Sequence, residues 1–257
     1  MENLEQLMYT LLAYTNNSLE KDINYSIARS FLDHIDKIET FSLEAIAETC
    51  NVAPSTINRF CKKIGFKNFS NLRNSVILSN KTGASNEYTD HFLNATQFKE
   101  QLQENVDMID RIPTEKIERV VTLINKSKRV ILISFEKYQI QTLELQKKLL
   151  LLGKFCECDT NLFKQMDSLD VLTEEDLIIT ISIQGHLLAE ELPLIEKIRT
   201  AKGKKVLITF SNGQQHHGAF DEIIQCGKIE NSAVSSQTLL RLFDVLVYWV
   251  NDYTYDL

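Results

Sequence analysis

The sequence predicts two domains of different class: an all-α N-terminal domain and an α/β C-terminal domain, the latter with three α/β/α layers around a five-stranded parallel sheet. Three observations predict this division. Apolar residues recur at helical spacing up to about residue 78, the polar stretch "SNKTGASNEYTDHF" follows, and short apolar strands then alternate with helices. We therefore expect a helical domain at 1–78, a linker at 79–98 and an α/β domain at 99–257.

Composition excludes several classes of protein. The 257 residues, 44% of them hydrophobic, are enough for one large domain or two modest ones. No run approaches the roughly 18 apolar residues of a membrane span, and the first residues lack the basic region of a secretory signal. Five scattered cysteines do not form the pattern of a disulfide framework. We expect a cytoplasmic protein without membrane contact.

An acid-free segment stands out in this acidic chain. The net charge is -7, yet residues 51–81 hold six basic and no acidic residues, which leaves -13 on the remainder. Such a split is typical of a part that meets a polyanion, although a basic run alone is usually a solvated face. The helices predicted around the segment decide between these interpretations.

Two helices are predicted immediately before this segment in the sequence. An apolar stripe at helical spacing predicts one amphipathic helix at about 24–37, formed by Ile27, Ala28, Phe31, Leu32, Ile35 and Ile38. Ser42 is placed to cap a second helix, in which Ile46 and Ala47 face inward. The tripeptide "TCN" then makes a short turn, and Val52 is expected to be a buried anchor.

A third helix is predicted from Pro54, whose fixed φ suits the first helical position, to Gly65, a typical C-terminal stop. One side carries the apolar residues Ile57, Phe60, Cys61 and Ile64. A short turn followed by a helix with a basic polar face predicts a helix-turn-helix that enters the major groove. The expected DNA-binding residues are Ser55, Thr56, Asn58, Arg59, Lys62, Lys63 and Lys67. The alternative is a basic helix on a fold that never meets DNA.

These residues resemble the N-terminal domain of the RpiR/MurR transcriptional regulators over about Leu4 to Leu78. The residues at the family's spacing are Ala47, Val52, Ser55, Thr56, Arg59, Phe60, Lys63, Gly65, Phe66, Phe69 and Leu72. One departure is Ala53, where members often have a capping Ser. The resemblance implies a regulator of sugar or amino-sugar metabolism that binds a double-stranded DNA operator and is not an enzyme.

The second half alternates strands with helices, which indicates a parallel sheet covered on both faces. The expected strands are Arg129 to Ser134, Lys154 to Cys158, Asp176 to Ser182, Lys205 to Phe210 and Glu222 to Cys226. In such sheets ligands bind at the carboxyl ends of the strands. The apolar last helix, Leu239 to Trp249, is a candidate dimer contact, with internal packing as the alternative.

This half resembles the sugar isomerase (SIS) domain of the same regulators over about Ile117 to Tyr253. The fitting residues are Leu149, Gly153, Asp176, Ser182, Gly185, Gly203, Thr209 and Asp244. The resemblance implies a homodimer or higher homo-oligomer and a phosphosugar effector. The residues expected to line the effector site are Ser134, Lys137, Ser182, Gln184, Gly185, His186 and Thr209.

The sequence departs from the SIS pattern where the ligand would lie. Glu136 replaces a glycine and Tyr138 a hydroxyl anchor after the first strand, while Gln184 and Leu187 replace hydroxyl residues after the third. Three functions therefore stay open: a regulator that senses a phosphosugar, a regulator whose SIS domain binds no ligand, and a sugar-phosphate isomerase that would use Glu136 and His186.

Two small clusters invite a metal hypothesis. Cys156 and Cys158 would point to one face of a strand, and "QQHH" at Gln214 to His217 holds adjacent histidines. Neither has the further ligands that a zinc site needs, so packing and solvation are the simpler interpretations. We expect no metal and no cofactor.

Overall fold

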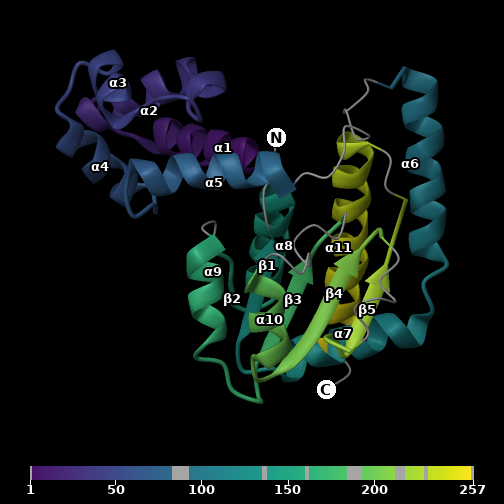
Figure 1. Cartoon of the computed structure of the whole chain (residues 1–257). Helices are drawn as coiled ribbons and strands as arrows, with labels where there is room; N and C mark the ends of the chain where they lie inside the picture. Colours follow the sequence, from purple (N-terminus) through teal and green to yellow (C-terminus); the bar gives the residue numbers. More distant parts are fainter. Residues whose placement is uncertain are drawn as a thin grey trace. The chain divides into compact units, whose positions relative to one another are not determined.

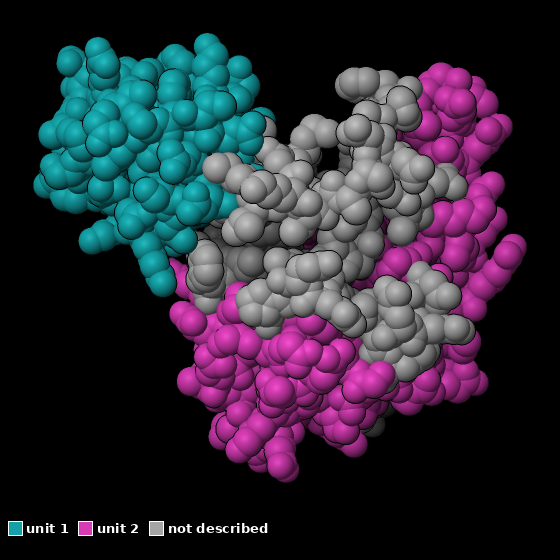
Figure 2. Space-filling model, in the orientation of Figure 1, with its two compact units in different colours: residues 1–86 teal, residues 87–257 magenta. Residues whose placement is uncertain are grey.

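The computed structural model describes residues 2–82, 93–134, 138–159, 162–183, 193–211, 218–228 and 231–255. The chain divides into two compact units, residues 1–86 and 87–257, which Figure 2 colours separately. The described part of the chain holds no helix that is both long enough and apolar enough to cross a bilayer.

The N-terminal unit is built of helices (Figure 1). They are α1 (Glu2–Asn17), α2 (Ile23–Asp33), the 3-10 helix η1 (Ile35–Lys37), α3 (Leu43–Thr49), α4 (Pro54–Lys63) and α5 (Phe69–Thr82). Their apolar faces meet in one core, where the Phe31 ring packs edge-on against Phe60 and Phe69 at centroid distances of 5.6 and 6.0 Å. The helix-turn-helix that the sequence predicts is therefore formed by α3 and α4.

The first predicted helix is shorter than expected. It ends at Asp33 rather than near residue 37, and η1 carries the chain on to Ile38. Within this turn the Lys37 amide donates to the His34 carbonyl at 2.9 Å, so the backbone remains hydrogen-bonded while changing direction. Ile38 still reaches the core and is fully buried.

The C-terminal unit is an α/β domain (Figure 1). Its elements are α6 (Ala95–Asp110), α7 (Thr114–Lys126), β1 (Val130–Ser134), α8 (Gln139–Leu151), β2 (Cys156–Glu157), α9 (Leu162–Leu169), β3 (Leu177–Ile181), α10 (Pro193–Thr200), β4 (Lys204–Thr209), β5 (Glu222–Gln225) and α11 (Ser232–Tyr255). The five strands are all parallel in the order β2-β1-β3-β4-β5. The predicted three-layer class with a five-stranded parallel sheet is confirmed, whereas α9 was not predicted from the sequence.

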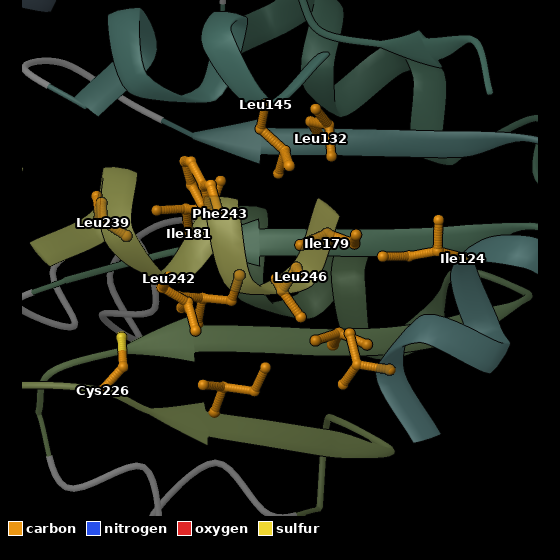
Figure 3. Close-up of a cluster of buried hydrophobic side chains, with 14 of the residues drawn as sticks. Ile124, Leu132, Leu145, Ile179, Ile181, Cys226, Leu239, Leu242, Phe243 and Leu246 are labelled. Atoms are coloured by element: carbon orange, nitrogen blue, oxygen red, sulfur yellow. The ribbon is translucent and has the colours of Figure 1, made fainter. Parts of the chain in front are cut away.

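The sheet is covered on both faces because successive side chains alternate. Leu132, Ile179 and Ile181 belong to the core beneath α7, α8 and α11, whereas Ile131 and Ile178 belong to the core beneath α9 and α10. Figure 3 shows the first of these cores, with Leu242, Phe243 and Leu246 of α11 against the strands and Leu145 of α8 beside Leu132.

The last helix packs internally. Its apolar residues Leu239, Leu242, Phe243, Leu246 and Val250 are all buried in the core of the C-terminal unit. Of the two interpretations of this helix, the structure therefore supports internal packing.

The expected linker at 79–98 overlaps described helices at both ends. α5 continues to Thr82, and α6 begins at Ala95 with Asn94 as its cap. The Thr96 and Gln97 amides both donate to Asn94 Oδ1 at 3.0 Å, and the Asn94 amide donates to Gln97 Oε1 at 3.1 Å. This capping box starts α6 at Ala95, inside the stretch that we expected to be linker. Residues 83–92 lie outside the described part.

Candidate nucleic-acid interface and ligand-binding edge

The turn between α3 and α4 is closed without glycine. Ser42 caps α3, because the Ala45 amide donates to its hydroxyl at 3.0 Å. After α3, Asn51 adopts a left-handed φ of 51°, which Asn tolerates better than most residues. The Asn51 amide donates to the Glu48 carbonyl and the Val52 amide to the Ala47 carbonyl, both at 2.9 Å. This is a Schellman ending, which directs Val52 toward the core.

Helix α4 begins and ends where its sequence predicts. Pro54 occupies the first turn, and Ala53 at the cap position makes no side-chain hydrogen bond to it, as expected for the missing Ser. At the other end Gly65 has φ 95°, which favours glycine. The Phe66 amide donates to the Cys61 carbonyl at 2.9 Å, forming a second Schellman ending. These local signals set the length of α4.

The two faces of α4 have different environments. Ile57, Phe60 and Cys61 are fully buried. On the outer face Ser55, Arg59 and Lys62 are exposed and Thr56 is half-buried. The Arg59 guanidinium donates to Thr56 Oγ1 at 3.2 Å, one helical turn earlier. Such a face offers hydroxyl and guanidinium donors of the kind that contact phosphates and base edges.

Asn58 has a structural role that the sequence analysis missed. Its side-chain oxygen Oδ1 accepts a hydrogen bond from the Phe69 amide at 3.0 Å. Phe69 is the first residue of α5, so this bond ties α4 to the start of the next helix. Asn58 therefore stabilises the fold through Oδ1. Its predicted contact with DNA would have to be made by the side-chain nitrogen Nδ2.

Three further basic residues of the acid-free segment differ in how they are held. Lys63 places its ammonium 5.4 Å from the centre of the Tyr14 ring, and hydrogen bonding to Tyr14 raises the pKa of this lysine. Arg73 donates to the Phe41 carbonyl at 3.0 Å. Lys67 is exposed, and its backbone amide donates to Asn71 Oδ1 at 3.2 Å. Arg73 therefore braces the unit, whereas Lys67 presents its charge to solvent.

The second candidate site lies at the carboxyl edge of the sheet, where β1 and β3 are neighbours. The chain leaves β1 toward β2 on one side and reaches β3 on the other, which is the switch point where ligands bind in open α/β sheets. Ser134 ends β1 opposite Ile181 of β3, and Ser182 follows directly. Both serines are buried, and among the described residues neither hydroxyl has a hydrogen-bond partner.

Thr209 differs from the two serines in its hydrogen bonds. It ends β4 on the face that α9 and α10 cover, whereas Ser134 lies on the face that α8 covers. The Thr209 hydroxyl lies 2.8 Å from Ser211 Oγ and 3.4 Å from the Ile183 carbonyl. It thus stabilises the turn after β4, in contrast to the unpaired serine hydroxyls.

Gln165 and Tyr138 lie close in the fold to the carboxyl end of β1. Gln165 of α9 donates to the carbonyls of Ser134 at 2.7 Å and Asp159 at 2.6 Å, which holds the end of β1; the sequence analysis did not single it out. Tyr138, expected at a phosphate anchor position, is 6% exposed and belongs to the hydrophobic core. The remaining predicted residues lie outside the described part: Lys137, Gln184, Gly185 and His186.

Some residues that carry the SIS resemblance are structural. Gly203 has φ 90°, and a Cβ there would lie 2.5 Å from the Asp176 carbonyl oxygen. Asp176 is buried, and its Oδ2 accepts from the Thr173 amide at 2.8 Å. Both residues lie at the amino ends of β3 and β4, away from the candidate edge.

The cysteine pair has the properties of packing residues. Cys156 is buried and Cys158 half-buried, and desolvation raises the pKa of their thiols to about 12 and about 11. Burial thus favours the neutral thiol at both positions. In the described part, no three His, Cys, Asp or Glu side chains are grouped to hold a metal ion. The histidines of "QQHH" lie outside it.

Comparisons with known proteins concern the helix-turn-helix segment and the fold. Residues 10–82 match the helix-turn-helix domain of the rpiR family. A Haemophilus influenzae protein named as an uncharacterized HTH-type transcriptional regulator is 26% identical over 171 residues, which are 62% of this chain and 59% of that protein. The chain thus matches about three fifths of that relative's length.

Two solved structures share the fold. The Vibrio vulnificus NanR protein complexed with ManNAc-6P has a TM-score of 0.55 at 17% identity, covering 97% of this chain and 93% of that chain. The E. coli CFT073 protein c3406, also solved as a complex, has a TM-score of 0.52 at 14% identity, covering 63% of this chain and 94% of that chain. At these identities the likeness establishes the fold alone.

Proposed function

Because residues 10–82 form a helix-turn-helix domain of the rpiR family, we propose that this chain is a DNA-binding transcriptional regulator. The observation that carries the proposal is the outer face of α4, where Ser55, Arg59 and Lys62 are exposed on a helix whose other face closes the core. Such a helix fits the major groove. The name of the Haemophilus relative supports the same role, and no catalytic residue is assigned.

The proposed regulator acts as a homodimer. A single helix-turn-helix contacts few base pairs, whereas two copies bind half-sites about one helical turn apart, roughly 10–10.5 base pairs from centre to centre. Linking two weak half-site contacts raises the operator affinity, because the second contact forms within a complex that already exists. The C-terminal unit is the part proposed to join the copies.

The salt dependence of binding tests the DNA interface. If Lys62 and Lys67 each neutralise one phosphate, replacing either by Ala lowers the slope of log affinity against log salt by about one unit. Fluorescence anisotropy with duplex DNA at several salt concentrations gives this slope. The matched control is Lys202→Ala, because Lys202 is an exposed lysine of the C-terminal unit. This variant should leave the slope unchanged. Equal slopes for the wild type and the three variants would show that neither Lys62 nor Lys67 contacts a phosphate.

We propose a sugar phosphate as the effector of the C-terminal unit, with sugar or amino-sugar metabolism as the regulated process. Ser134 and Ser182 lie at adjacent strand ends, and among the described residues their buried hydroxyls have no hydrogen-bond partner. An unpaired buried hydroxyl costs about 1–3 kcal/mol, a cost that a polar ligand relieves. The neighbouring N-terminus of α8 has no side-chain cap from Tyr138, and helix N-termini favour anions. The fold neighbour complexed with ManNAc-6P supports the same ligand class.

Ser182→Ala separates ligand binding from stability. The Ser182 hydroxyl has no hydrogen-bond partner in the described part of the chain, so the unfolding temperature of the variant without ligand should stay equal or rise slightly. In the wild type, a bound hexose, pentose or amino-sugar phosphate at 100 times its dissociation constant adds about 2.7 kcal/mol of stability. Ser182→Ala should lose this gain in a thermal-shift screen.

The matched control for this screen is Thr180→Val. Thr180 also has a buried hydroxyl without a partner among the described residues, but it lies inside β3, two residues before Ser182. Thr180→Val should therefore retain the ligand-induced gain. If no sugar phosphate stabilises the wild type, the unit is the ligand-free assembly domain that the substitutions at Glu136 and Tyr138 leave open.

A further inference from the structure

Helix α8 is apolar on two opposite sides. Its inner side, with Thr142, Leu145 and Leu149, is fully buried against the sheet and α11. Its outer side carries Ile140, Leu143, Glu144, Lys147, Leu150 and Leu151, which recur at intervals of three and four residues and so share one face. We name these six residues the α8 outer face. A single packed side needs only one apolar stripe, so a second stripe on the opposite side calls for a second partner.

Exposed apolar residues are concentrated on this face. Among the described residues, 11 large hydrophobic side chains are exposed, and five of them lie between residues 140 and 155. Ile140, Leu143, Leu150 and Leu151 are 57%, 47%, 52% and 79% exposed, and Phe155, just beyond the helix, is 66% exposed. Exposed apolar side chains gathered on one helix face in this way mark a surface that another protein covers.

The charges in the middle of the face point to its occupant. Glu144 and Lys147 form an ion pair at 2.6 Å, with apolar residues toward both ends of the helix. A two-fold axis crossing α8 midway between them would set each Glu144 opposite the Lys147 of a second copy. The same axis sets each Ile140 opposite Leu151. This is the self-complementary arrangement that a two-fold interface requires.

We propose that the α8 outer face is the dimer interface, with a second copy of this chain packed antiparallel on it. The interface rests on the proposed function and deepens it by naming the surface that joins two helix-turn-helix units. The pattern of apolar ends and a central Glu–Lys pair selects an identical copy over an unrelated partner, because each charge meets its opposite on both sides of the axis.

Charge reversal in the full-length chain tests this interface. Lys147→Glu places two glutamates of one copy against two of the other, so the dimer dissociation constant should rise by on the order of 10-fold or more. Glu144→Lys should weaken the dimer similarly. The double variant Glu144→Lys/Lys147→Glu restores opposite pairs and should return the constant to within about threefold of wild type. Sedimentation equilibrium gives all four constants.

Lys202→Glu is the control: it makes the same change in net charge at an exposed lysine outside the α8 outer face. Its dimer dissociation constant should equal that of the wild type. A monomeric wild type, a Lys147→Glu chain that dimerises normally, or a swap that fails to restore the dimer would each overturn the proposal. Binding to non-specific duplex DNA, measured in parallel, separates the two proposals. Chains that dimerise without binding DNA would contradict DNA binding but not the interface. Monomers that bind DNA would contradict the homodimer and its interface but not DNA binding.

Discussion

Replacing Phe60 by Ala is expected to lower the free energy of unfolding of the N-terminal unit by about 3–5 kcal/mol. Phe60 is fully buried, and its ring meets Tyr14 and Phe31 edge to face at centroid distances of 5.5 and 5.6 Å. Since whole domains are stable by only about 5–15 kcal/mol, this loss removes much of the unit's stability. DNA binding should be lost with it, because α4 is then no longer held.

The chain carries its own internal control for this variant. Its single tryptophan, Trp249, packs against the core of the C-terminal unit, so tryptophan fluorescence reports that unit alone. Circular dichroism reports the helices of both units. Phe60→Ala should lower the first helical transition by about 4–8 °C per kcal/mol while the Trp249 transition stays in place. Phe60→Leu, which keeps most of the apolar contact, should show a smaller shift. A loss below about 1 kcal/mol would contradict the packing described for α4.

Replacing Arg59 by Ala is expected to cost about 1–3 kcal/mol of specific DNA affinity, roughly 5- to 150-fold. Arg59 is exposed on the outer face of α4, and its hydrogen bond within the unit goes to Thr56 on the same face. The fold therefore loses little, and the unfolding temperature should be unchanged. Anisotropy titrations with a specific and an unrelated duplex measure the affinity for each.

Arg59→Lys is the matched control. It keeps the positive charge but removes the planar fork that binds guanine with two hydrogen bonds. We expect it to retain binding to unrelated DNA and to lose most of the preference for the specific duplex. Asn58→Ala is a poor test of the groove contact, because losing the bond to the Phe69 amide destabilises the unit as well. Full specific affinity in both Arg59 variants would place another residue in the groove.

The parts of α4 that sequence predicts well depend on neighbours in the chain. Pro54 starts the helix and Gly65 ends it through φ restrictions that act within one turn. The structural use of Asn58 escaped prediction because its partner Phe69 lies 11 residues away, beyond any helical period. The early end of α2 at Asp33 escaped for the opposite reason, since the apolar spacing continues unbroken through η1 to Ile38.

In the C-terminal unit, too, features set by neighbouring residues can be predicted from the sequence, whereas features set by distant residues cannot. Runs of consecutive apolar residues predict β1, β3 and β4, because both faces of a parallel sheet are buried. The edge strand β2 is shorter than the expected Lys154 to Cys158 and contains only Cys156 and Glu157. The orientation of Tyr138 does not follow from its position in the loop pattern: it joins the core rather than the carboxyl edge. Likewise, the lack of described hydrogen-bond partners for the Ser134 and Ser182 hydroxyls depends on atoms from other elements, which spacing in the sequence does not report.

Selection of bound duplexes from a random DNA library tests the central claim most directly, namely that the chain reads DNA through α4 as a dimer. The wild-type chain should enrich one motif in two inverted copies whose centres are about 10–10.5 base pairs, or a multiple, apart. The Arg59→Ala chain should bind the same library more weakly and lose its preference at one position in each copy. Enrichment of no motif by the wild type, or of the same motif with equal preference by Arg59→Ala, would contradict the assignment of α4 as the helix that reads DNA.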